Sequence, residues 1–393
     1  MTLKFRQSLE GFGPSVIRSI FDAAPAGALN MGLGMPDVKI PATVIQAVEA
    51  ELSTRRAPYS PNAGQRSLRE AIAKMYGSWR QRDPSVAIGG WYSADGVIVT
   101  AGAQEALYVA MASLCEPGGE ILVPDPGFAA YPMIARCIGA KVRHYPVSAS
   151  NGFRPTASGI VSALTPKTRA VVLGSPANPT GVMIGAEEME SICLALGYHG
   201  VPYISDEIYD RYTWSGPFVS PSRFSDHGVV VSGLSKSGGL MGWRLGWLVV
   251  PAASAQIPTA VHQSLCSCAS TLSQAGALAA LEILNEEGPD GQWLNDALKV
   301  FEDRRARALS CVSSLGLRHA PADGAFYLFV EVSPRLRSGE DDMTFCRRLA
   351  SEHGVVMIPG QGFGDEGRGW VRIAYTCDAI EEGFERLEQG LRG

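Results

Sequence analysis

The chain of 393 residues is long enough for a large domain with a smaller one, and its 46% apolar and 19% charged residues are ordinary for a protein with a sizeable core. The net charge of −5 comes without a basic block, which argues against nucleic acid as a partner. The start of the chain has no signal-peptide pattern and no apolar run is of membrane-spanning length, so we expect no membrane partner.

The eight cysteines and six histidines show no ligand spacing. The closest cysteine pair, Cys266-Ser-Cys268, fits neither a zinc knuckle nor a C-x-x-C redox motif. We therefore expect no metal site, and we expect the cysteines to be reduced core residues of a cytoplasmic protein.

Short apolar runs between residues 96 and 250 predict the strands of a sheet. The expected strands are 96–100, 120–124, 141–147, 170–173, 202–205, 228–232 and 245–250. Apolar periodicity predicts helices at 15–21, 41–55, 65–79 and 187–196, and a further helix from 104. Strands that alternate with helices indicate an α/β fold with a mostly parallel sheet.

The C-terminal part has a different pattern. A helix-rich stretch covers 254–284, and a long helix is expected over 293–315, with Arg304 and Arg305 facing outward. The remaining expected elements are strands at 324–330, 355–360 and 370–375, a helix at 343–353 and a C-terminal helix. We predict an arm over residues 1–40 that joins a smaller α+β domain over 286–393, and a large domain over 41–285.

One lysine lies on a turn of small residues between two core strands. It is Lys236, in a segment that runs Ser-Gly-Leu-Ser-Lys-Ser-Gly-Gly-Leu-Met-Gly-Trp-Arg-Leu-Gly-Trp over residues 232–247. A partly desolvated amine beside another cation has a lowered pKa and can attack a carbonyl carbon to form a Schiff base. Ser235, Ser237 and Arg244 are residue types that hold a phosphate beside it. A glycine-rich loop with a solvated lysine is the alternative.

A second candidate follows strand 96–100. The backbone N–H groups of Gly102, Ala103 and Gln104 open a helix there and converge on a possible anion site. Such a turn suits a phosphate, although any strand–helix connection has the same local pattern.

Asp206 and Asn178 each follow a buried strand. A buried aspartate is costly unless it has a partner. Capping of the next helix is the alternative for Asp206. Asn178 lies in an Asn-Pro-Thr-Gly turn, at the sheet edge where α/β proteins bind ligands.

The pattern Ser-Lys-x5-Gly-Trp-Arg-x-Gly-Trp resembles the cofactor-lysine motif of class I/II aminotransferases, pyridoxal-phosphate (PLP) enzymes of fold type I in the aspartate aminotransferase superfamily. The resemblance extends over roughly residues 12–390 and rests on a shared order of anchors: Gly102, Phe128, Asn178, Asp206, Tyr209, Lys236 and Arg244. It implies a large domain with a mostly parallel seven-stranded sheet between helices, a smaller α+β domain, and a homodimer with sites shared across the interface.

The resemblance also implies the cofactor contacts. Lys236 forms the aldimine with PLP, Asp206 pairs with the ring nitrogen, and Arg244 binds the phosphate together with Ser235 and the turn at 102–104. Ala101 and Ala103 lack the hydroxyl or amide that the family usually offers at that turn, so the turn would act mainly through its backbone.

Three other contacts follow from the same resemblance. Phe128 stacks on the ring, although core packing is equally compatible with this residue. Tyr209 and Asn178 hydrogen-bond the phenolic oxygen, and Tyr209 would lie one helical turn after Asp206 if the chain is helical there. Tyr59 reaches the phosphate of the neighbouring subunit, unless it packs only locally.

The substrate contacts are expected from the arm and the C-terminal part. Gly34 lies over the substrate, and Asn178 borders it. Arg372, on an interior strand, needs an anion and clamps the substrate α-carboxylate, with a structural salt bridge as the alternative. We also hypothesise that Arg18 binds a second carboxylate and admits glutamate or 2-oxoglutarate.

The predicted activity is transfer of an amino group from an L-amino acid to a 2-oxo acid, through aldimine, quinonoid and ketimine intermediates. Lys236 is the general base, Asp206 keeps the ring an electron sink, and Tyr209 completes the catalytic set. A PLP-dependent lyase or decarboxylase on the same residues is one alternative. A non-catalytic PLP-binding module is the other, and the short arm and acidic charge weigh against it.

Overall fold

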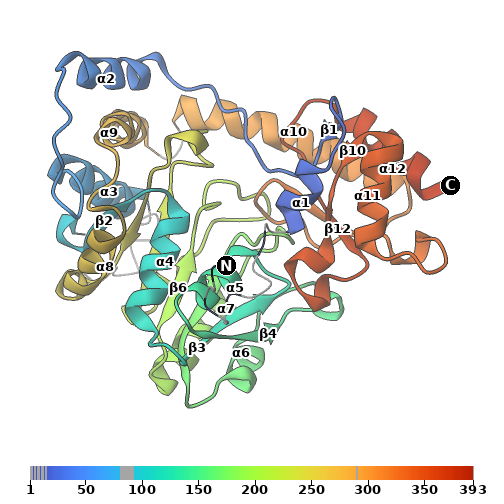
Figure 1. Ribbon diagram of the computed structural model, residues 1–393, viewed down its shortest axis with the longest axis horizontal. Helices are drawn as coiled ribbons and strands as arrows, with labels where there is room; N and C mark the ends of the chain where they lie inside the picture. The colour runs from blue at the N-terminus through green and yellow to red at the C-terminus, as the bar shows by residue number, and fades with distance from the viewer. Residues whose placement is uncertain are drawn as a thin grey trace.

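The computed structural model describes residues 16–79, 93–288 and 291–392 together with the isolated positions 3, 6, 9 and 13. Within helix α1 (Val16–Asp22) the side chains of Ile17 and Arg18 are not described. Two sheets of different size organise the chain, each with its own helices (Figure 1).

The large sheet has seven strands in the order β2-β8-β7-β6-β5-β3-β4. Their bounds are β2 (Val97–Thr100), β3 (Glu120–Asp125), β4 (Lys141–Pro146), β5 (Thr168–Gly174), β6 (Tyr203–Asp206), β7 (Gly228–Gly233) and β8 (Gly246–Val249). Strand β8 is antiparallel to β2 and β7, and the other pairs are parallel. Residues 234–245 join β7 to β8 by turns without a crossover helix, so the chain returns antiparallel. The expected mostly parallel α/β sheet is confirmed.

Helices cover both faces of this sheet because its strands are apolar on both sides. Val97 and Val99 belong to one buried cluster, whereas Ile98 belongs to the cluster on the opposite face. The helices are α2 (Ala42–Ser53), α3 (Arg66–Trp79), α4 (Ala103–Leu114), α5 (Ala130–Cys137), α6 (Ala157–Ala163), α7 (Ala186–His199), α8 (Gln256–Cys266) and α9 (Thr271–Glu287). Helices α4 and α5 pack on the face of Ile98, and α3, α6, α7 and α9 pack on the other.

The smaller unit is built around the antiparallel sheet β11-β12-β9, with β9 (Tyr327–Glu331), β11 (Ile358–Pro359) and β12 (Trp370–Ala374). Its helices are α10 (Gln292–Ser314), α11 (Asp342–His353) and α12 (Ile380–Arg392). The N-terminal strand β1 (Leu29–Asn30) pairs in parallel with β10 (Val355–Val356). Figure 1 shows this N-terminal segment, in blue, beside the C-terminal elements, in red.

The fold departs from the sequence expectations at three places. Helices α5 and α6 were not expected. The side chain of Arg304, expected to face outward, is only 2% exposed, because Asp37 and Asp378 approach it from the loops beside α10. Cys266 is exposed at the end of α8 instead of lying in the core, although all eight cysteines are free thiols. No helix within the described ranges is long and apolar enough to span a bilayer.

Candidate active site

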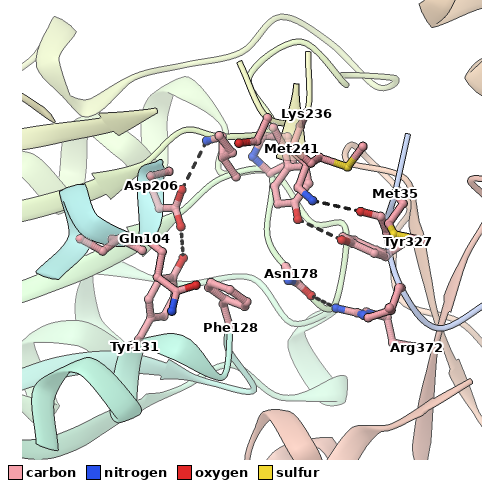
Figure 2. Close-up of a pocket in the computed structure, with 18 of the residues that line it drawn as sticks. Met35, Gln104, Phe128, Tyr131, Asn178, Asp206, Lys236, Met241, Tyr327 and Arg372 are labelled. Carbon is pink, nitrogen blue, oxygen red and sulfur yellow. Dashed lines mark hydrogen bonds between the residues drawn. The ribbon is translucent and has the colours of Figure 1, made fainter. Parts of the chain in front are cut away.

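A cavity of about 530 Å³ lies at the carboxyl edge of the large sheet, against the smaller unit. The segments that follow β2, β3, β5, β6 and β7 all contribute to its walls, and β9 and β12 close it from the other side. Figure 2 shows the side chains of Asp206, Lys236 and Arg372 around this one space. An edge where parallel strands end is the usual ligand site of α/β sheets.

Lys236 lies on the turn after β7, as the sequence predicted, and is partly buried. Its Nζ donates a hydrogen bond to the carbonyl oxygen of Gly34 at 3.0 Å. Burial, together with the positive charges of Arg372 and Arg244, lowers the pKa of Lys236 to about 8. Because more of this amine is neutral near pH 7 than of a solvated lysine, it is a better nucleophile.

Asp206 is the last residue of β6 and is buried in the inner wall of the cavity. Its Oδ2 accepts a hydrogen bond from the hydroxyl of Tyr131 at 2.8 Å, and its Oδ1 accepts one from the backbone N–H of Ile208 at 3.3 Å. Burial raises the pKa of Asp206 to about 6 despite these bonds. The residues after Asp206 form a turn and not a helix, and Tyr209 lies on that turn.

The turn at 101–104 and Arg244 form the outer end of the site. Helix α4 begins after Gly102, which has φ of +91° and supplies no side-chain cap. A Cβ built on Gly102 would lie 2.4 Å from Nη2 of Arg244, and other residues rarely adopt this φ, so glycine favours this approach. Arg244 donates hydrogen bonds to the carbonyl oxygens of Met241 and Ala101 at 3.0 and 3.4 Å. Free helix N–H groups and an exposed guanidinium therefore converge on one place.

Arg372, on β12, is 2% exposed and is held without an acid. Its Nη1 donates to Oδ1 of Asn178 at 2.7 Å, and its Nη2 donates to the carbonyl oxygen of Gly32 at 2.6 Å. The aromatic faces of Tyr327 and Phe363 lie 4.4 and 4.9 Å from its guanidinium carbon. Its Nε is buried without a partner, and no carboxylate in the described part of the chain pairs with it. The salt-bridge alternative for Arg372 thus finds no support.

Aromatic side chains shape the rest of the cavity. Phe128 lines it edge-on to Tyr131, with ring centroids 5.5 Å apart. The hydroxyls of Tyr209 and Tyr327 are hydrogen-bonded at 2.9 Å (Figure 2). Gly34 must be a glycine, because a Cβ there would lie 2.2 Å from the hydroxyl of Tyr327.

Most predicted site residues meet in this cavity. Those that line it are Gly34, Ala103, Gln104, Phe128, Asn178, Asp206, Tyr209, Ser235, Lys236, Arg244 and Arg372. Tyr59 does not: its side chain is 85% exposed, so its expected reach to a neighbouring subunit stays a prediction. The side chain of Arg18 lies outside the described residues.

Sequence reasoning missed two residues of the site, Tyr131 and Tyr327. Tyr131 follows Phe128 by three residues, a spacing that places both on one side of a helical turn. Tyr327 alternates with apolar residues along β9, as Arg372 does along β12, and the two are brought together by the pairing of those strands. The local spacing of Tyr131 was a usable signal, whereas the pairing of Tyr327 with Arg372 needs the sheet register.

A family model for aminotransferase class I and II matches residues 26–387. The chain is 35% identical over 371 residues to a probable N-acetyl-LL-diaminopimelate aminotransferase of Bacillus subtilis, with 92% of this chain and 88% of the relative covered. It is 29% identical over 395 residues to aromatic-amino-acid aminotransferase 2 of Thermococcus litoralis, with 98% and 97% covered.

Solved structures of aminotransferases are also similar to this chain. The aspartate aminotransferase of Thermus thermophilus with maleate superposes with a TM-score of 0.88 at 27% identity, covering 99% of this chain and all of that one (100%). The chain belongs to the class I and II aminotransferase family, whose members depend on PLP.

Proposed function

We propose that this chain is a PLP-dependent aminotransferase that moves the amino group of an L-amino acid to a 2-oxo acid. One observation carries the proposal: an amine of lowered pKa, a buried carboxyl and a buried guanidinium without an acid face one cavity. Transamination needs one of each, for covalent attachment, for control of a ring nitrogen and for orientation of an α-carboxylate.

The residues present fit PLP. Lys236 would hold its carbonyl carbon, and Asp206 would face the ring nitrogen, where a cationic N–H offsets the cost of a buried carboxylate. The N–H groups of the 102–104 turn, with Ser235 and Arg244, would hold the phosphate. When bound, PLP supplies a conjugated ring that delocalises the electron pair left by the broken Cα–H bond.

Each charged residue then has one task. Asp206, in its ionised form, holds a proton on the ring nitrogen, and Tyr131 keeps that carboxylate oriented through its hydroxyl. Lys236, once released from the cofactor, takes the proton from the substrate Cα through Nζ. Arg372 binds the α-carboxylate and so fixes the direction of the Cα–H bond toward Lys236.

Substrate choice is the finer part of the proposal. The named relatives act on chemically different donors, from N-acetyl-LL-diaminopimelate to aromatic amino acids, so the α-carboxylate site is what we carry over. We keep the hypothesis that Arg18 binds a second carboxylate. In its support, α1 lies against the turn at 360–363: Val16 comes within 3.0 Å of a Cβ built on Gly362, and the next residue, Phe363, contacts Arg372.

The assembly and compartment are also proposed. We infer a homodimer with shared sites, because α2 and the following loop leave Ile45, Leu52 and Tyr59 exposed. The free thiols of all eight cysteines favour a reducing compartment such as the cytoplasm.

The test is product analysis on the purified holoenzyme with a panel of L-amino acids and one 2-oxo acid. We expect a new amino acid that matches the added oxo acid, and no ammonia. The Lys236→Ala variant should lose turnover, whereas Lys299→Ala, at a side chain that is 75% exposed, should not. Ammonia released without an acceptor would favour a lyase, and no turnover across the panel would contradict the proposal. For Arg18→Ala, an unchanged glutamate-to-alanine rate ratio would sink the second-carboxylate hypothesis.

A further inference from the structure

A cluster of three potential metal ligands lies outside the cavity, between helices α4 and α8. Glu105 comes from the first turn of α4, and His262 and Cys266 come from α8, four residues apart on one helix face. Glu105 Oε1 is 3.0 Å from His262 Nδ1 and 3.3 Å from Cys266 Sγ. Cys266 Sγ is 3.8 Å from His262 Nδ1.

This triangle of atoms has the size of one face of a zinc tetrahedron. Zinc binds carboxylate oxygen and imidazole nitrogen at about 2.0 Å and thiolate sulfur at about 2.3 Å, which places neighbouring ligand atoms roughly 3.3–3.6 Å apart. The separation of 3.3 Å lies within that range, and those of 3.0 and 3.8 Å differ from it by a few tenths of an ångström. Small side-chain rotations therefore bring all three atoms to bonding distance of one ion.

The geometry disfavours a catalytic cysteine. In a Cys–His–acid relay the thiol and the acid contact opposite nitrogens of the imidazole. Here Cys266 and Glu105 both contact Nδ1, so the three groups converge on a point instead of forming a chain. The other nitrogen, Nε2, is buried and has no partner within the described ranges, so Nδ1 is the nitrogen through which His262 would bind a metal ion.

The cluster combines a rigid interior with access from solvent. His262 is fully buried and the side chain of Glu105 is 13% exposed, whereas Cys266 is exposed. A metal ion can thus enter past Cys266, and a water molecule can complete a fourth position.

We propose that Glu105, His262 and Cys266 form a zinc site. Thiolate, imidazole and carboxylate together are a donor set that favours Zn²⁺ over Mg²⁺ or Ca²⁺, and binding would release the thiol proton of Cys266 to solvent. The sequence predicted no metal site, because the cysteines and histidines show no ligand spacing of their own. His262 and Cys266 meet Glu105 only through the packing of α8 on α4.

The ion would hold two loops near the cavity in place. The second oxygen of Glu105 accepts a hydrogen bond from the backbone N–H of Ala101, in the turn that borders Arg244. Ser267, next to Cys266, accepts a hydrogen bond from Asn62 at 2.9 Å, in the loop that follows Tyr59. Zinc would therefore stabilise the fold here and take no part in the chemistry at Lys236.

The test is titration of chelator-treated holoenzyme with Zn²⁺, followed by calorimetry, and with Co²⁺, followed by its visible d–d absorption. We expect one equivalent of metal per chain and a rise in the melting temperature. Cys266→Ser and His262→Gln should weaken binding by at least about 100-fold, because even the loss of an outer-shell partner costs 10- to 100-fold. Cys311→Ser, which removes a distant free thiol, should bind like the unaltered protein.

Two results would overturn the proposal. One is that the unaltered chain takes up no metal at micromolar Zn²⁺. The other is that Cys266→Ser and His262→Gln bind as tightly as Cys311→Ser, which would place the metal elsewhere. The metal-free variants should melt within a few degrees of the metal-free parent, so a loss of binding is not mistaken for a loss of folding.

Discussion

Two regions of the molecule each bury an arginine to the same extent, at 2% exposure, but satisfy it differently. Arg304, on α10, forms a bidentate pair with Asp37 at 2.7 and 2.9 Å and a second pair with Asp378 at 2.7 Å. Arg372, on β12, has an amide oxygen, a backbone carbonyl and two aromatic faces, but no acid in the described part of the chain. A cation that the fold has fully paired is structural, whereas one that the fold leaves without an anion is a binding site.

The surroundings of the two arginines differ as well. The acids of Arg304 are 58% and 81% exposed at their side chains, so water also solvates them and the pair anchors a loop at the surface. The loop that ends at Asp37 carries Gly34, whose carbonyl accepts the hydrogen bond of Lys236. Arg304 therefore acts on the site by holding a loop, and Arg372 acts on it directly.

The largest expected effect is on catalysis. Arg372→Met should lower kcat/KM for any L-amino acid by about 10²–10³-fold, because loss of one partner of a buried charge pair costs about 2–5 kcal/mol. Its free energy of unfolding, measured by urea denaturation of the cofactor-free protein, should not fall, since a buried unpaired cation is removed. A clear loss of stability with unchanged kcat/KM would reverse the assignment.

The double variant Asp37→Asn with Asp378→Asn should lose stability, in contrast to Arg372→Met. It leaves Arg304 as a buried cation without an acid, which we expect to lower the free energy of unfolding by about 3 kcal/mol. The matched control is Asp365→Asn, at a salt bridge whose side chains are 61% and 84% exposed and which should contribute less than about 1 kcal/mol. Equal losses of unfolding free energy in the double variant and in Asp365→Asn would show that the ion pairs of Arg304 do not have the structural role proposed for them.

Asp206 is a buried acid in the same cavity as Arg372, and its contribution to the free energy of unfolding depends on pH. In the cofactor-free protein its pKa is raised from 3.8 to about 6, so the folded state binds an extra proton between pH of about 4 and about 6. Stability attributable to Asp206 must then fall as pH rises through that window. Relative to the parent, Asp206→Asn should gain about 2–3 kcal/mol by pH 7 and almost nothing at pH 4. Urea denaturation of both proteins across this pH range measures the difference, and a pH-independent difference would be inconsistent with a raised pKa.

The smallest expected effect concerns Tyr327. Tyr327→Phe removes the hydrogen bond to Tyr209 but keeps the aromatic face on Arg372. One neutral hydrogen bond is worth about 1 kcal/mol, so KM for the amino acid should rise by less than about tenfold. Steady-state kinetics on this variant and on Arg372→Met separates two contributions to substrate binding. One is the hydrogen bond between Tyr327 and Tyr209, and the other is the guanidinium of Arg372.

The residues at the strand ends could be predicted from the sequence because their signals are local. Apolar runs located the strands, and Lys236, Asp206 and Asn178 each lie within a few residues of the end of such a run. Parallel strands bring those ends to one edge, so the cavity followed from the order of the elements.

The contacts that could not be predicted join residues that are far apart in the sequence. Helical periodicity placed Arg304 outward, whereas its acid Asp37 lies 267 residues away in sequence. The cluster of Glu105, His262 and Cys266 likewise joins residues 157 and 161 apart. Local patterns carry no record of such contacts, because they arise only when separate helices pack together.

The most direct test of the central claim is the binding of an unreactive monocarboxylate, 3-phenylpropionate, to the holoenzyme by isothermal titration calorimetry. If Arg372 is a carboxylate site, the unaltered protein should bind this probe competitively with the amino-acid substrate. Arg372→Met should then bind it at least about 30-fold more weakly, the equivalent of about 2 kcal/mol. Equal affinity for the two proteins would contradict the claim that the fold leaves Arg372 unpaired in order to bind a substrate.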